Sequence, residues 1–192
     1  MTKRVIVGIS GASGVIYGVR LLQVLQAVAE VETHLVISQS GRQTLALETS
    51  LSVRDVQRLA DVVHDVRDIA AAISSGSFKT CGMVILPCSI KTLSGIANGY
   101  DDGLLIRAAD VTLKERRPLV LCVRETPLHL GHLRLMVQAA ELGAIIMPPL
   151  PAFYHQPKRL EDIIDQTVNR VVDQLGLELP EDLFQRWPSH LR

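Results

Sequence analysis

The chain has 192 residues, 47% of them hydrophobic and only 4% aromatic, so it can bury a sizeable, mainly aliphatic core. Its 20 basic and 20 acidic residues cancel, which argues against a nucleic acid or an anionic membrane as its main partner. No apolar run approaches the ~20 residues of a membrane helix, and the chain enters a predicted strand at once, without a signal peptide. The three cysteines lack C-x-x-C spacing and predict buried, reduced thiols in a cytoplasmic protein: Cys81, Cys88 and Cys122.

The most informative stretch is the glycine-rich segment from Gly8 to Gly14. It follows an apolar strand predicted over 4–9 and precedes a helix predicted over 15–29. A strand, a glycine-rich turn and a helix together offer backbone N–H groups and a positive helix end to a phosphate. The spacing is G-x-x-G-x-x-G rather than the dinucleotide fingerprint G-x-G-x-x-G, and a tight turn without a ligand remains the alternative.

The second predicted strand favours a mononucleotide over a dinucleotide. It covers 32–37 and is followed by Ser38, whereas a dinucleotide enzyme usually has Asp or Glu near this point to hold the adenosine ribose. Two helices are predicted next, over 41–49 and 52–60, and Glu48 lies at the end of the first. Its residue type alone favours the interpretation that Glu48 is an ordinary solvated carboxylate.

A second strand-to-helix turn follows in the middle of the chain. Residues 61–73 show no clear pattern, and an apolar strand is then predicted over 83–86, ended by Pro87. Ser89 fits the N-cap of a helix that runs to about residue 97, with Thr92 at its third position. In a parallel sheet this turn and the glycine-rich turn both lie at the carboxyl edge, where ligands bind.

The next stretch is rich in cations. A helix is predicted over 104–116 and a strand over 118–123. Such a charge run usually marks a solvated face with surface ion pairs, and that interpretation stays open. Arg124 fits it least, because it directly follows a buried strand at the carboxyl edge. The cations are Arg107, Lys114, Arg116, Arg117 and Arg124.

The last third of the chain continues the alternation of helices and strands. A helix is predicted over 128–142, a strand over 144–147 and a helix over 160–175. His129 and His132 are spaced i, i+3 but have no carboxylate or cysteine partner at metal-ligand spacing, so no metal site is predicted. The first of these helices is expected to turn four side chains inward: Leu133, Met136, Val137 and Ala140.

The regular alternation predicts the α/β fold class: a single doubly wound, Rossmann-like domain over 1–192 with a mainly parallel sheet. The tail over 177–192 carries Phe184 and Trp187, and a free tail rarely carries such residues. We therefore expect the tail to pack on the body of the protein or on a neighbouring subunit.

Five segments carry a resemblance to a known family: G-A-S-G at 11–14, P-C-S-I-K-T at 87–92, R-A-A-D-V-T-L-K-E-R-R-P-L-V at 107–120, R-E-T-P at 124–127 and P-A-F-Y at 151–154. Over nearly its whole length the chain resembles the flavin prenyltransferases, formerly described as polyprenyl-hydroxybenzoate or aromatic-acid decarboxylases. It is similar to the branch that serves bacterial ubiquinone synthesis.

This resemblance implies an activity. The enzyme would join the five-carbon unit of dimethylallyl phosphate to N5 and C6 of reduced FMN, release phosphate, and supply prenylated FMN to a separate decarboxylase. The family needs no metal and forms homododecamers with sites at subunit interfaces.

The resemblance also implies the site residues, including Glu48, which the sequence pattern alone does not select. FMN binding falls to Gly11, Ala12, Ser13, Ser38, Ser89, Ile90, Lys91, Thr92 and Arg124. Dimethylallyl phosphate binding falls to Arg107, Lys114, Tyr154 and Arg170. The catalytic set is Ser13, Glu48, Lys114, Arg124 and Glu125, of which Ser13 and Glu48 assist proton handling near flavin N5.

Two other functions compete with this one. The first is an oxidative flavoprotein decarboxylase acting on a cysteine carboxyl group, which would need a catalytic mid-chain histidine, and His64 is the candidate. The second is a non-enzymatic FMN carrier, which would have no need of the cations and the tyrosine that the resemblance assigns to the allylic phosphate.

Overall fold

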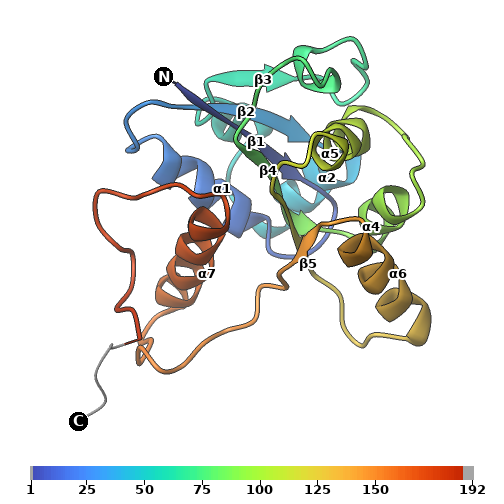
Figure 1. Cartoon of the computed structure of the whole chain (residues 1–192). Coiled ribbons are helices and arrows are strands. Elements are labelled where there is room, and N and C mark those ends of the chain that lie inside the picture. The colour runs from blue at the N-terminus through green and yellow to red at the C-terminus, as the bar shows by residue number, and fades with distance from the viewer. Residues whose placement is uncertain (1, 188–192) are drawn as a thin grey trace.

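The computed structural model describes residues 2–187, and their six strands form one sheet in the order β3-β2-β1-β4-β5-β6 (Figure 1). Every strand pair in this sheet is parallel. The order reverses at β1, which is the arrangement of a doubly wound α/β fold and confirms the predicted fold class. The strands are β1 (Lys3–Ile9), β2 (Val31–Ile37), β3 (Val62–His64), β4 (Gly82–Cys88), β5 (Leu119–Val123) and β6 (Ile145–Ile146).

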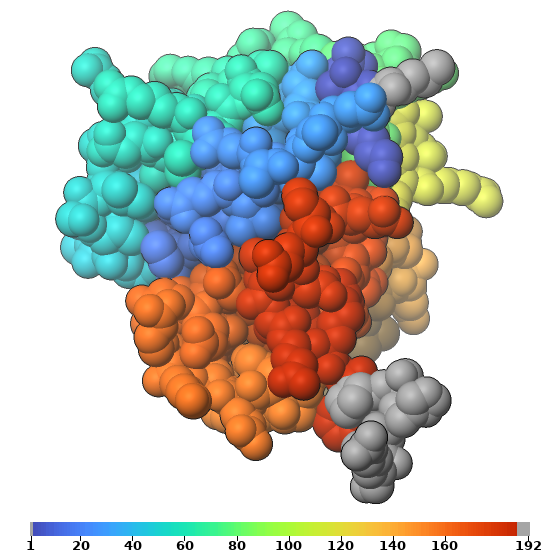
Figure 2. Space-filling view, turned by 90° about the vertical axis from the view of Figure 1, so that its left-hand side faces the viewer, coloured from blue at the N-terminus to red at the C-terminus, as the bar shows by residue number. Residues whose placement is uncertain are grey.

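Helices cover both faces of the sheet, as the continuously apolar strands require. The core on one face is closed by α1 and α7, and the core on the other face by α4, α5 and part of α6 (Figure 1). Figure 2 shows the C-terminal helix and the segment after it, in red, lying against the N-terminal part of the chain. The helices are α1 (Val15–Leu25), α2 (Gln39–Glu48), α3 (Val53–Gln57), the 3-10 turn η1 (Ala72–Ser74), α4 (Ile90–Ala97), α5 (Leu104–Lys114), α6 (Leu130–Glu141) and α7 (Leu160–Gln174).

The predicted end of β4 is wrong. The strand runs through Pro87 to Cys88 instead of stopping at residue 86. Its pairing with β5 shifts register between Ile85 and Cys88, and a proline is tolerated in a strand where the ladder is interrupted in this way. The turn that follows therefore starts at Ser89, directly beside the end of β1.

The predicted inner face of α6 is also wrong. Of the described residues of this helix, Ala139 alone is buried, while Leu133 is 45% and Val137 58% exposed. Ala140 is exposed as well, and Met136 is half-buried against the core. An amphipathic pattern shows that a helix has an apolar face, but it does not show that the same chain covers that face.

Two aromatic residues after α7 lie near the loop between β6 and α7. The ring centroids of Tyr154 and Trp187 are 5.3 Å apart, and those of Tyr154 and Phe184 are 6.3 Å apart. Trp187 is still 60% exposed, and residues 188–192 of the predicted tail lie outside the described part of the chain.

The edge strand β3, which the sequence did not predict, is tied to β2 by a pair of histidines. His34 Nδ1 lies 3.0 Å from His64 Nε2, and the two rings stack with centroids 5.3 Å apart. His34 Nε2 lies 2.8 Å from a carboxylate oxygen of Glu32, which also accepts a hydrogen bond from Arg4. Burial of the ring and then the neighbouring His34 lower the pKa of His64, although the nearby Asp68 opposes this.

This pair predicts a pH dependence of stability. The pKa of His64 is lower in the folded chain than in the unfolded chain. Below about pH 6.5 the unfolded chain therefore binds a proton that the folded chain excludes, and the free energy of unfolding decreases as the pH is lowered. Urea unfolding at about pH 7 and about pH 5.5 should show a smaller pH-dependent loss for His64→Gln than for wild type. Glu32 stays charged in this window, because hydrogen bonds from His34 and Arg4 lower its pKa. Equal losses for both proteins would contradict the assignment.

Candidate active site

The two predicted turns lie side by side at the carboxyl edge of the sheet, because β1 pairs with β4. A cavity of about 470 Å³ opens between them, within the range of roughly 300–1,000 Å³ found for small-molecule sites. Residues from six segments of the chain line it. Seven of them belong to the predicted site: Gly11, Ser38, Ser89, Ile90, Lys91, Thr92 and Glu125.

Two helices begin at this cavity with serine N-caps. The Ser38 hydroxyl accepts a hydrogen bond from Gly41 N at 2.9 Å, and the Ser89 hydroxyl accepts one from Thr92 N at 3.3 Å. The predicted N-cap at Ser89 is thereby confirmed. Helix N-termini carry partial positive charge, so the starts of α2 and α4 favour an anionic group in the cavity.

Gly11 allows the glycine-rich turn to approach the start of α2. A Cβ atom at this position would collide with the Ser40 side chain and would lie 3.0 Å from the Ser40 carbonyl carbon. Both residues line the cavity, so a larger residue at position 11 would push apart two of its walls.

The N-terminus of α1 is occupied by the carboxylate of Glu48, from the end of α2. Glu48 accepts hydrogen bonds from Gly14 N at 2.8 Å and Val15 N at 3.2 Å. Partial burial raises the pKa of Glu48. Hydrogen bonds from the Ser13 hydroxyl and from these two N–H groups, with the charge of Arg124, outweigh burial and leave the pKa below its usual value. Glu48 is therefore ionised at neutral pH beside Ser13 and Arg124.

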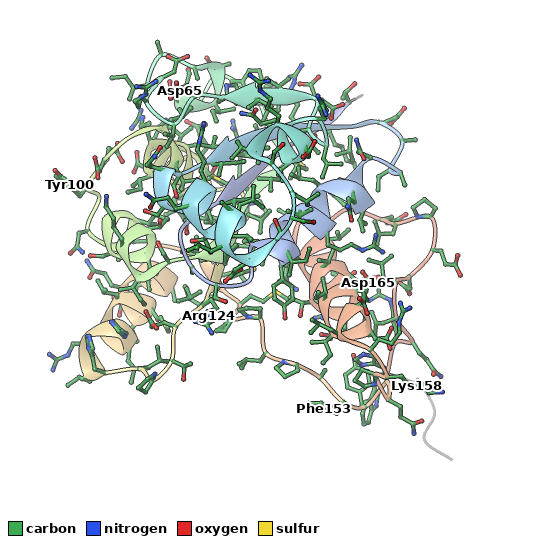
Figure 3. The ribbon with its side chains drawn as sticks, turned by 180° about the vertical axis from the view of Figure 1, so that it is seen from behind. Asp65, Tyr100, Arg124, Phe153, Lys158 and Asp165 are labelled. Atoms are coloured by element: carbon green, nitrogen blue, oxygen red, sulfur yellow. The ribbon has the colours of Figure 1, made fainter. Side chains whose placement is uncertain are left out.

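Arg124 directly follows the last residue of β5, and its positive charge acts on the carboxylate of Glu48. Its backbone N–H donates to the carbonyl of Cys88 at 3.0 Å, which ties the end of β5 to the end of β4. Figure 3 shows Arg124 at the carboxyl edge of the sheet, with Phe153 on the loop between β6 and α7. The next residue, Glu125, lines the cavity.

Two cations predicted to bind substrate do not line the cavity. Helix α5 runs antiparallel to the strands, so its first turn lines the cavity while its last residue, Lys114, lies near the start of β5. Lys114 Nζ pairs there with Glu115 at 2.6 Å. Arg107 pairs with Asp110 at 2.8 Å and Asp101 at 3.5 Å.

The other two predicted substrate residues also have partners elsewhere. Tyr154 packs edge-to-face against Trp187, and Arg170 on α7 pairs with Asp173 at 2.7 Å. Within the part of the chain that the structure describes, the predicted flavin-binding residues gather at one edge and the predicted substrate-binding residues do not join them.

Eight residues of the cavity wall are not among the predicted site residues: Gln39, Ser40, Val66, Arg67, Asp102, Gly103, Leu105 and Ile106. Val66 and Arg67 come from the segment that had no assignment, and Asp102 comes from the turn before α5. Asp102 pairs with Lys91 at 3.1 Å across the rim of the cavity. No periodicity or motif marks Val66, Arg67 or Asp102, because they are brought to the site only by the path of the chain between strands.

The three cysteines and His129 take no part in the chemistry of this site. All three cysteines are free, and burial raises the pKa of the Cys88 thiol to about 12 and also raises that of Cys122, so neither is a thiolate at neutral pH. His129 caps α6 by accepting a hydrogen bond from Gly131 N at 3.0 Å. Across residues 2–187, no three His, Cys, Asp or Glu side chains are grouped to hold a metal, and no helix has the length and hydropathy to cross a membrane.

Comparison with known proteins gives consistent matches. Residues 1–172 match the Flavoprotein family. The chain is 77% identical over 185 residues to the flavin prenyltransferase UbiX of Escherichia coli, which covers 96% of this chain and 98% of that protein. It matches a crystal structure of AnUbiX in complex with FMN and dimethylallyl pyrophosphate, with a TM-score of 0.94, 45% identity and full coverage of both chains. A dodecameric FMN-dependent UbiX-like decarboxylase from Escherichia coli matches with a TM-score of 0.92 and 51% identity, covering 97% of this chain and all of that one.

The carboxylate at the start of α1 predicts a stability effect. Glu48→Ala leaves Gly14 N and Val15 N without their acceptor and removes a negative charge from a helix N-terminus. We expect a loss of about 0.5–1 kcal/mol in the free energy of urea unfolding at neutral pH, at the low end for a lost cap because the carboxylate is exposed. Gln43→Ala, at an exposed position of the same helix, is the control and should stay within about 0.5 kcal/mol of wild type. Equal losses for the two variants would count against the capping role.

Proposed function

The chain belongs to the flavin prenyltransferase family, and we propose that its prenyl transfer takes place at the cavity on the carboxyl edge of the sheet. The reaction joins the dimethylallyl unit of dimethylallyl phosphate to N5 and C6 of reduced FMN and releases phosphate. One observation carries this proposal. Seven residues that the family resemblance assigns to the site come from turns far apart in the chain and line one cavity. His64, the candidate of the cysteine-decarboxylase alternative, is engaged with His34 instead of lining this cavity.

The size and the donor set of the cavity support FMN as its ligand. The serine-capped starts of α2 and α4 suit the flavin phosphate, and Leu105 and Ile106 of α5 supply an apolar wall for the ring system. Bound there, reduced FMN supplies the electron-rich N5 and C6 atoms that accept the five-carbon unit. The side chains of the protein orient it, exclude water and handle charge.

Arg124 and Glu48 divide the handling of charge. Negative charge grows on the phosphate as it leaves the allylic unit, and the guanidinium of Arg124 stabilises it where it develops. Glu48 is ionised and bonded to the Ser13 hydroxyl, so this pair can accept a proton and hold it near the reacting atoms. The Glu125 carboxylate, on the same turn as Arg124, completes the charged wall of the cavity.

Other copies of the chain supply the remaining substrate residues in this proposal. Lys114 lies at the far end of α5, and Arg107, Tyr154 and Arg170 do not line the cavity of their own chain, so the family role of these residues requires a neighbouring subunit. The dodecameric assembly of the relative with 51% identity supports this arrangement.

The reaction and the role of Arg124 are tested together. Incubation with FMN, a reductant and dimethylallyl phosphate, or the diphosphate in a parallel sample, should give a flavin whose mass has increased by the prenyl unit. Arg124→Ala should lower the single-turnover rate about 10²–10³-fold, the usual effect of losing one donor to a developing charge. Arg58→Ala, at an arginine whose side chain is 76% exposed, is the control and should keep the wild-type rate. A flavin of unchanged mass contradicts the activity, and an unimpaired Arg124→Ala contradicts the assignment.

A mixture of variants tests whether a second copy completes the site. Arg124→Ala and Lys114→Ala chains should each be inactive alone. Co-expressed, they should regain part of the activity, because some sites then combine an intact Arg124 with an intact Lys114 from another chain. A mixed assembly as inactive as its parents would place both residues in the same chain.

The exposed apolar residues of α6 support self-association. Leu130, Leu133 and Val137 follow helical spacing and are 60%, 45% and 58% exposed. Val137→Glu should therefore reduce the assembly mass measured by light scattering, because a charge would be buried at the contact. Gln138→Glu adds the same charge beside this stripe and should leave the mass unchanged. A monomeric wild type would exclude the assembly.

We further propose that the product passes to a separate decarboxylase in ubiquinone synthesis. The name of the relative with 77% identity supports this branch of the family. We also propose a cytoplasmic location, which the three free cysteines support because a reducing compartment keeps thiols unpaired.

A further inference from the structure

Ser10 is a fully buried polar residue between the two turns of the site. Its hydroxyl lies 2.9 Å from the carbonyl oxygen of Pro87, to which it donates. The same hydroxyl accepts a hydrogen bond from Ser89 N at 2.8 Å. Its side chain has 0% exposure and does not line the cavity, so it makes no direct contact with a ligand there.

The hydroxyl replaces backbone hydrogen bonds that the sheet cannot make at this point. The paired register of β1 and β4 ends at Gly8 and Ile85, and Pro87 has no N–H to donate to its neighbour. Ser10 N donates to the Pro87 carbonyl at 3.2 Å, and the Ser10 side chain then engages Ser89 N. One side chain therefore extends the connection between the strands past the proline.

This link fixes the turn that begins α4. With its backbone N–H held by Ser10, Ser89 keeps its hydroxyl free to cap Thr92 N and to donate to Thr92 Oγ1 at 3.1 Å. Ser10 directly precedes Gly11, which lines the same cavity from the other side. A shift of either turn is therefore transmitted to the other through this hydroxyl.

We infer that Ser10 is a positioning residue for FMN binding: its hydroxyl sets the distance between the glycine-rich turn and the turn from Ser89 to Thr92. The inference rests on the proposed function, because it takes this cavity as the FMN site. Without the hydroxyl, Ser89 N and the Pro87 carbonyl lose a buried partner, and the turn can move to satisfy them elsewhere.

A double-mutant cycle on the full-length protein tests this inference. Calorimetry would give the Kd for FMN of wild type, Ser10→Ala, Ser89→Ala and the double variant. We expect Ser10→Ala to raise Kd about tenfold, as the loss of one hydrogen bond does. The double variant should bind much more tightly than the product of the two single effects predicts, because Ser10 acts through the Ser89 turn. Ser10→Thr keeps the hydroxyl and should restore the wild-type Kd.

A matched control separates positioning from general stability. The Thr112 hydroxyl is also buried and donates to the Ala108 carbonyl at 2.7 Å, in the half of α5 that lies away from the cavity. Thr112→Val should lower thermal stability but leave the Kd for FMN unchanged. If Ser10→Ala does not fold, Ser10→Cys takes its place. Its thiol is a weaker hydrogen-bond donor than the hydroxyl, so the Kd for FMN should rise, but by less than the tenfold expected for Ser10→Ala.

The outcomes distinguish the two levels of the proposal. If wild type does not bind FMN, the proposed function fails. If wild type binds and Ser89→Ala weakens binding, but Ser10→Ala keeps the wild-type Kd, the positioning role is overturned. Independent effects of the two serines, multiplying in the double variant, would also overturn it.

Discussion

The parallel pairing of β1 with β4 is the constraint on which the cavity depends. These strands are neighbours in the sheet, although two other strands lie between them along the chain. The helices that follow them, α1 and α4, pack on opposite faces, so the two turns separate and leave space between them. Close approach at Gly11, capping by Ser89 and the link through Ser10 all shape that one space.

Local patterns were enough to predict the turns that make this cavity. Glycines after an apolar run and a serine before a helix are signals within a few residues, and the structure has the expected turns at Gly11 and Ser89. The alternation of strands and helices likewise led to the doubly wound sheet, because right-handed crossovers leave few other arrangements. At Pro87 a local rule was misleading, since the strand continues through an interrupted ladder.

Local patterns could not predict contacts between residues that are far apart in the sequence. Glu48 meets Gly14 across 34 positions, and nothing near Glu48 in the sequence marks it as a helix cap. Lys114 belongs to the basic stretch that leads to Arg124. Helix α5 has 11 residues, and at about 1.5 Å per residue it spans roughly 16 Å, enough to carry Lys114 to the other edge of the sheet. The apolar stripe of α6 was predicted correctly as a stripe and incorrectly as part of the chain's own core.

The separation of the two turns along the chain also bears on when the site can appear during folding. Ser10 and Ser89 are 79 positions apart, so the walls of the cavity meet only after a long loop has closed and β1 has found β4. Such non-local pairing is slow compared with the formation of the single helices around it. A ligand of this cavity therefore has nothing to bind in an early, partly helical chain. It stabilises the sheet after that step, by mass action on the folded state.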